Sequence, residues 1–141
     1  AIVEHLADKV GRDRFWPKEE DARAMARSMA AEMHSGYLAL RKQCPMNVRR
    51  RVEDAKIDED ARGDVVRILT LWAEARARFG KGGPFLFGTV SLADAFFAPI
   101  AVRLRTYQVE LPPVDAAYVE TIYQWPAFKA WQQAGLEEVA R

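Results

Sequence analysis

Apolar residues recur every three or four positions along most of the chain, which is the spacing of one face of an α-helix. The clearest stripe comprises Ala22, Met25, Met29, Met33, Tyr37 and Leu40. It predicts one long helix that has Pro17 in its first turn, runs to about Lys42 and stops before Pro45. The acidic residues that follow Pro17 suit a helix N-terminus, because they face its partial positive charge.

The same period predicts helices on both sides of this one. A first helix spans 1–10 and ends at Gly11, a residue type favoured after a helix C-terminus. Another starts near Asp58 and ends at Gly80. Its apolar side comprises Val65, Ile68, Leu69, Trp72 and Phe79. Strand signals are almost absent, so the chain predicts an all-α domain of about six helices around one core.

The last third of the chain carries the sharpest local signals. Residues 80–88 are rich in glycine and proline and predict a tight loop. Ser91 and Asp94 then form a shortened capping box, in which each side chain can bond the backbone amide of the other. The helix that follows has Pro99 inside it and should bend there. Two more helices are expected, one capped by Asp115 and one opened by Pro126.

Composition excludes several classes of function. The 141 residues carry 21 Lys and Arg against 20 Asp and Glu, so nothing in the net charge favours nucleic acid or anionic lipid as a partner. The one dense basic run, Arg49 to Arg51, is interpreted as a solvated surface. No apolar run is long enough to span a membrane, and the N-terminus does not resemble a signal peptide.

The cysteine and histidine content is low. A single cysteine, Cys44, excludes an internal disulfide and favours a reducing compartment, the cytoplasm. Cys44 follows a predicted helix C-terminus, where no positive pole would lower its pKa, so we interpret it as structural. Two histidines and one cysteine give no metal-site spacing, so no metal is expected.

Five short segments, in order, resemble one known family. They are 1–6 (AIVEHL), 15–17 (FWP), 31–37 (AEMHSGY), 88–95 (GTVSLADA) and 125–128 (WPAF). Together they resemble the C-terminal helical domain of cytosolic glutathione S-transferases, of the bacterial type. The resemblance covers essentially the whole chain. It implies that 1–11 is the last helix of a thioredoxin-fold domain, that 12–17 is the interdomain linker, and that 18–141 is the helical domain.

In that family the thioredoxin-fold domain binds glutathione and supplies a Ser, Tyr or Cys that activates its thiol. The helical domain forms one wall of the pocket for a small hydrophobic electrophile, and half of a homodimer interface. Glutathione is therefore the expected co-substrate, and the catalytic residue is expected outside this chain, which by itself should be inactive. The first residue is not Met, which fits a chain cut inside a larger protein.

The resemblance also nominates site residues on the long helix. His34 corresponds to a histidine that lines the active-site cleft near the glutathione sulfur, although Ser35 stands where those members have Lys. Arg27 and Glu32 correspond to polar positions that can reach glutathione bound to the partner subunit. Without the resemblance, each would be interpreted as an ordinary surface residue, and Tyr37 is interpreted as packing.

Two alternatives stay open at this stage. The methionine stripe, with Ala22, Ala26 and Ala30 beside it, is either core or a subunit seam, because small residues allow helices to approach closely. The function is either that of an enzyme domain or that of a non-catalytic protein-interaction domain. Similar domains of the second kind occur in translation factors and synthetase complexes.

Overall fold

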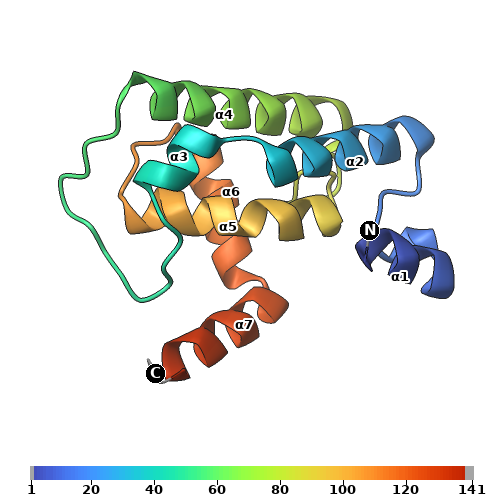
Figure 1. Cartoon of the computed structure of the whole chain (residues 1–141). Helices are drawn as coiled ribbons and strands as arrows, with labels where there is room; N and C mark the ends of the chain where they lie inside the picture. Colours follow the sequence, from blue (N-terminus) through green and yellow to red (C-terminus); the bar gives the residue numbers. More distant parts are fainter. Residues whose placement is uncertain (1, 139–141) are drawn as a thin grey trace. The chain divides into compact units, whose positions relative to one another are not determined.

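The computed structural model describes residues 2–138, which contain seven α-helices, one short 3₁₀ helix and no strand beyond isolated bridges at 85–89. The elements are α1 (Ile2–Val10), η1 (Arg12–Arg14), α2 (Glu20–Ser35), α3 (Leu38–Gln43), α4 (Glu59–Phe79), α5 (Leu92–Thr106), α6 (Pro113–Gln124) and α7 (Pro126–Glu137) (Figure 1). The all-α prediction is therefore confirmed. The bounds predicted for α4 and the start predicted for α7 are also confirmed.

The chain divides into two compact units, whereas the sequence pattern predicts one core. The first unit comprises residues 1–36 and 69–97, and the second comprises 37–68 and 98–141. Two of the boundaries fall inside α4 and α5, so each of these helices contributes residues to both units. A periodic pattern predicts continuous helices, and it carries no information on how their contacts group.

Aromatic packing forms the centre of the first unit. Trp72 of α4 meets Phe97 of α5 edge to face, with ring centroids 5.8 Å apart and planes at 84°. Both residues are fully buried. Such a pair contributes about 0.5–1.5 kcal/mol beyond the burial of its surface. Phe79, at the end of α4, stacks on Phe87 of the 80–90 loop at 6.0 Å. The loop therefore belongs to the core rather than to a linker.

In the second unit, side-chain oxygens accept hydrogen bonds from backbone N–H groups at the ends of helices. Asp64 of α4 accepts a hydrogen bond at 2.9 Å from the backbone N–H of Leu40, one of the N–H groups that the first turn of α3 cannot bond internally. Asp58 accepts from the N–H of Ala61 at 3.0 Å and so caps α4, as its predicted position requires. Gln43 in turn accepts from the N–H of Asp58 at 2.9 Å.

The long helix predicted up to Lys42 is wrong, because α2 ends at Ser35 and α3 begins at Leu38. Gly36 has an extended backbone, and a Cβ there would lie only 2.7 Å from the carbonyl oxygen of Glu32. Tyr37 follows in the left-handed conformation with φ 60° and ψ 42°, which is uncommon for a bulky residue. The apolar stripe continues across this break, so periodicity could not reveal it.

Two predicted helix starts also need correction. Pro17 precedes α2, whose N-cap is Glu19, and the Glu19 carboxylate accepts from the N–H groups of Asp21 and Ala22 at 2.9 and 2.7 Å. Asp115 is not the N-cap residue of α6, which is Pro112. That helix begins at Pro113, so Asp115 is buried within its first turn. In both cases the residue type suits a helix start, but the helix begins a few residues away from the predicted position.

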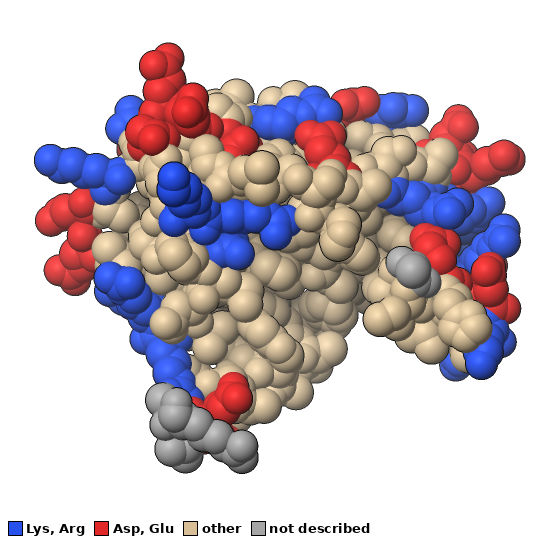
Figure 2. Space-filling model, in the orientation of Figure 1, with Lys and Arg blue, Asp and Glu red and all other residues tan. Residues whose placement is uncertain are grey.

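The surface of the described residues carries both basic and acidic side chains. Figure 2 shows Lys and Arg interspersed with Asp and Glu along the top and the sides of the visible face, whereas its centre consists of other residues. None of the helices within residues 2–138 is both long and apolar enough to cross a bilayer.

Candidate functional site

The four residues nominated from the sequence all lie on α2, within its last nine residues. Arg27, His34 and Ser35 are exposed, and Glu32 is half-buried. The opposite side of the helix is buried, with Ala22, Ala26, Met29, Ala30 and Met33 in the core. The helix therefore holds the polar residues on a rigid element whose position is fixed by its apolar side.

Helix geometry brings only two of the four residues to one side. Arg27 and His34 are two turns apart, so at about 100° per residue they point in nearly the same direction. Glu32 lies about 140° around the axis from Arg27, on the other flank of the buried face. Ser35 points away from the core, and its hydroxyl donates back to the carbonyl of Ala31 at 3.1 Å. Arg27 and His34 are thus the pair that could share one ligand.

Arg27 already has a partner within the chain. Its Nε lies 3.2 Å from a carboxylate oxygen of Glu4 on α1, in an ion pair whose side chains are 54% and 37% exposed. Exposed pairs of this kind contribute only about 0–1 kcal/mol. A ligand carboxylate could therefore compete for the guanidinium at small cost. The pair also shows that Arg27 faces α1.

His34 is exposed, which excludes a role as a core histidine. An exposed imidazole on a rigid helix is accessible to a ligand, and its ring nitrogens can form hydrogen bonds. Within residues 2–138 no three His, Cys, Asp or Glu side chains gather closely enough to hold a metal ion. The chemistry available on this flank of α2 is therefore hydrogen bonding and positive charge.

The capping box at the start of α5 is a structural site. Asp94 is fully buried, and its carboxylate accepts from the N–H of Ser91 at 2.8 Å and from the Ser91 hydroxyl at 3.2 Å. The carboxylate half of the predicted box is thus confirmed, and the bond from the Asp94 amide to the Ser91 hydroxyl stays a prediction. The second carboxylate oxygen accepts from the N–H of Leu86 at 3.2 Å. Nothing in the local sequence pattern indicated this link to the loop.

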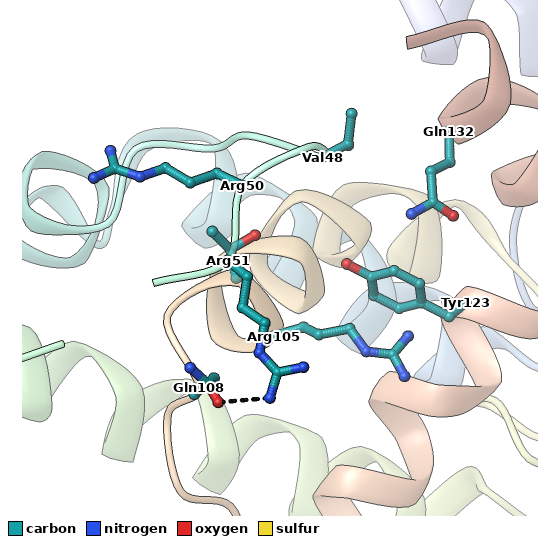
Figure 3. Close-up of a pocket in the computed structure, with 8 residues that line it drawn as sticks. Val48, Arg50, Arg51, Arg105, Gln108, Tyr123 and Gln132 are labelled. Carbon is teal, nitrogen blue, oxygen red and sulfur yellow. Dashed lines mark hydrogen bonds between the residues drawn. The ribbon is translucent and has the colours of Figure 1, made fainter. Parts of the chain in front are cut away.

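A pocket of about 450 Å³ in the second unit gathers residues from four segments (Figure 3). Its walls comprise Val48, Arg50, Arg51, Arg105, Thr106, Gln108, Tyr123 and Gln132. In Figure 3 the Tyr123 hydroxyl and the Gln132 side chain point into the space below Val48, and Arg51 descends to Gln108. Sequence analysis singled out the basic run but not the pocket, because its walls lie up to about eighty positions apart in the chain.

Residues 20–134 match the family described as Glutathione S-transferase, C-terminal domain. The chain belongs to this family. No curated protein matches the chain. The match covers α2 to α6 and most of α7, and it begins where α2 begins. The glutathione S-transferase C-terminal domain is thus the part of the chain that carries the α2 site, the capping box and the pocket, whereas α1 and η1 precede it.

The alanine side of α2 is part of the interior of this glutathione S-transferase domain and not a subunit seam. Ala22, Ala26 and Ala30 are at most 4% exposed, because the other residues of the same chain cover them. These alanines, with Met29 and Met33, are therefore core, and the seam interpretation is wrong for the alanines, whereas Met25 is half-buried. Any interface between two copies must use other residues.

Cys44 of the glutathione S-transferase domain is structural, as interpreted from the sequence. It is fully buried, and burial raises the pKa of its thiol, opposed by the positive charge of Arg103. Arg103 donates to the Cys44 carbonyl at 2.7 Å and so satisfies a backbone group at the end of α3. The thiol is a poor nucleophile in these surroundings.

The basic run needs correction at one position. The guanidinium of Arg49 donates to the carbonyl oxygens of Gly135 at 3.1 Å and Leu136 at 3.0 Å, and also to that of Glu138. These carbonyls end α7, where the partial negative charge of the helix favours a cation. Arg49 is thus a helix cap rather than a merely solvated side chain. Arg50 and Arg51 line the pocket.

Proposed function

We propose that this chain is the helical half of a glutathione S-transferase-like enzyme, which conjugates glutathione to a small hydrophobic electrophile or performs a related glutathione-dependent reaction. Membership of the family carries the proposal. The helical domain forms one wall of the electrophile pocket, and glutathione is the co-substrate. A non-catalytic interaction domain is the alternative, and the exposed Arg27 and His34 on one side of α2 favour the enzyme.

The exposed apolar side of α1 supports the proposed domain division. Ile2, Leu6 and Val10 recur every four residues, so they share a side of α1, and they are 78%, 42% and 47% exposed. Only Ala7 of α1 is buried, and the family match begins at residue 20. An apolar helix side left open to water calls for a partner. We assign residues 1–11 to a thioredoxin-fold glutathione-binding domain, 12–17 to the linker, and 18–141 to the helical domain.

The roles proposed for the α2 residues come from the family resemblance, and their chemistry is compatible with them. Arg27 would hold a carboxylate of glutathione, because a guanidinium pairs with a carboxylate through parallel hydrogen bonds. His34 would lie by the sulfur and favour its thiolate, the form that attacks electrophiles. Glu32, like Arg27, would reach glutathione bound to the partner subunit, and Ser35 would lie beside His34, where similar members have Lys. The residue that activates the thiol, a Ser, Tyr or Cys, lies outside these 141 residues.

The whole protein is proposed to be a cytoplasmic homodimer without a metal. Cys44 is the only cysteine and is buried as a free thiol, which suits a reducing compartment. Homo-oligomers with two-fold symmetry are the commonest assemblies of soluble proteins. The dimer would place α2 residues of one copy near glutathione bound to the other.

The proposal is tested by supplying the missing half. The 141-residue chain, assayed with glutathione and an aryl halide, should show no turnover above the uncatalysed rate. The same helical domain joined to a glutathione-binding domain ahead of residue 1 should show turnover that depends on glutathione. Turnover by the chain alone would contradict the domain division. Absence of any glutathione-dependent rate in the two-domain protein, with glutathione bound normally, would favour the interaction domain.

A further inference from the structure

The pocket of Figure 3 lies within the second unit, and none of its walls comes from the residues nominated for glutathione. At about 450 Å³ it falls in the range of small-molecule sites, which is about 300–1,000 Å³. Its residues come from the connection after α3, the end of α5, α6 and α7. It therefore calls for an occupant of its own.

The walls of the pocket are fixed to one another by hydrogen bonds. The N–H of Val52 donates to the carbonyl of Thr106 at 2.8 Å, and the Thr106 hydroxyl donates to the carbonyl of Asn47 at 3.0 Å. These bonds tie the connection at 47–52 to the end of α5, while Arg49 ties it to the end of α7. A site held in this way is formed before its ligand arrives, which lowers the entropic cost of binding.

Gln108 adds a strained element to the pocket wall. It follows α5 with φ 49°, the left-handed region that residues other than glycine seldom adopt. Its amide accepts from the Arg51 guanidinium at 2.9 Å and donates to the carbonyl of Val52 at 2.8 Å. Strained backbone of this kind is concentrated at binding sites. Here it holds the Arg51 guanidinium at the pocket.

The pocket has a surplus of positive charge. Arg105 is paired with Glu120 at 2.6 Å, and its guanidinium lies 3.9 Å from the centre of the Tyr123 ring. Arg51 has the neutral Gln108 as its partner, and no described residue offers a carboxylate to Arg50 or Arg51. In Figure 3 Arg50 extends outward from the rim. The Arg51 guanidinium is thus the charge within the pocket that has no carboxylate partner.

Tyr123 supplies a neutral donor beside these charges. Burial raises the pKa of its hydroxyl, and the charge of Arg105 opposes that rise. The hydroxyl is therefore protonated near neutral pH and can donate to an anion. In Figure 3 it points into the space between Arg51 and Gln132.

We propose that this pocket binds a small organic phosphate monoester, with its phosphoryl group between Arg51, Arg105 and the Tyr123 hydroxyl. The phosphoryl oxygens can accept from the Arg51 guanidinium, which has no carboxylate partner, from the Arg105 guanidinium, which also pairs with Glu120, and from the Tyr123 hydroxyl. The volume exceeds what the phosphoryl group alone requires, so the organic part occupies the space next to Val48 and Gln132. This proposal does not depend on glutathione chemistry.

Phenyl phosphate titrated into the full chain by calorimetry tests the proposal. We expect saturable binding, tighter than that of inorganic phosphate, and a loss of about tenfold or more in affinity in Arg51→Gln, which removes one charge-assisted contact. Arg62→Gln is the matched control, because Arg62 is also an exposed arginine of this unit bonded to a neutral oxygen, the Ile57 carbonyl, and it lies outside the pocket. Its affinity should stay within about twofold of the parent.

Three results would overturn the proposal. The first is absence of saturable binding up to about 10 mM phenyl phosphate, which is about tenfold above a Kd of about 1 mM, the affinity of a weak site. The second is an equal affinity for phenyl phosphate and inorganic phosphate, since the organic part would then make no contact. The third is an equal loss in Arg51→Gln and Arg62→Gln, which would reveal a general effect of net charge.

Discussion

Asp94 and Arg27 are both charged residues on helices of the first unit, yet their surroundings are opposite. Asp94 is fully buried, and its carboxylate accepts hydrogen bonds from two backbone N–H groups and one hydroxyl. The Arg27 side chain is 54% exposed and paired with one exposed carboxylate, that of Glu4. The Asp94 carboxylate stabilises the fold, because both of its oxygens accept hydrogen bonds in the interior. The Arg27 guanidinium stays available for a ligand, because it is exposed and its ion pair is weak.

The largest effect is expected from Asp94→Ala. Two buried N–H groups, those of Leu86 and Ser91, would lose their acceptor, and each unsatisfied group costs about 1–3 kcal/mol. We expect the free energy of unfolding to fall by about 2–4 kcal/mol in denaturant melts. Asp58→Ala is the control, because Asp58 also accepts from a backbone N–H but is exposed. Equal losses in the two variants would show that burial of the carboxylate does not matter.

The control residue also predicts a pH dependence. Hydrogen bonds from the N–H of Ala61 and from Gln43 lower the pKa of Asp58 below its ordinary value. A lowered pKa in the folded state means that the charged form contributes stability above the unfolded pKa, and that this contribution is lost as the pH falls through the folded one. The stability difference between the parent and Asp58→Ala should therefore shrink on acidification. A difference that is constant from neutral to strongly acidic pH would contradict the cap.

A pair of glycines tests the break that ends α2 directly after His34 and Ser35. In Gly36→Ala the new Cβ would meet the Glu32 carbonyl at 2.7 Å, so we expect a loss of about 1–2 kcal/mol. Gly63 lies within α4, is exposed, and has no neighbouring atom within 4 Å of a new Cβ. Gly63→Ala should gain about 0.5–1 kcal/mol, because alanine favours a helix interior. Thermal melts that reverse this order would contradict the described break.

The smallest effect is expected at the ion pair of Arg27 and Glu4. A double-mutant cycle of Arg27→Ala and Glu4→Ala should give a coupling of about 0–1 kcal/mol, because both side chains are substantially exposed. The coupling should fall at high salt. A coupling well above this range would mean that Arg27 is a structural residue, and its assignment to glutathione would lose its basis.

Sequence alone predicted the all-α class, the bounds of α4, the start of α7 and the carboxylate half of the Ser91–Asp94 box. These features depend on residues close together in the chain, where helical spacing and capping chemistry are decisive. The break at 36–37 was missed, because the apolar stripe continues through it. The link from Leu86 to Asp94 was missed because it joins a loop to a helix.

The two candidate sites differ in the same way. The α2 site could be nominated from the sequence, because its residues lie within nine positions on one helix and a family resemblance identified them. The pocket of the second unit could not, since its walls meet only when the connection at 48–51, α5, α6 and α7 are brought together. A basic run is visible in a sequence. The sequence does not show that Arg51 pairs with the neutral Gln108 rather than with a carboxylate.

The most direct measurement of the proposed function compares His34→Ala with His5→Ala in the two-domain protein. Both histidines are exposed, and they are the only two in this chain, so His5 is a matched control. His34→Ala should lower kcat/KM for the glutathione reaction by about tenfold or more, which corresponds to about 1.4 kcal/mol of lost transition-state stabilisation. Its Tm should stay near that of the parent, and His5→Ala should change neither quantity. An unchanged kcat/KM in His34→Ala, or an equal loss in both variants, would contradict the placement of His34 beside the glutathione sulfur.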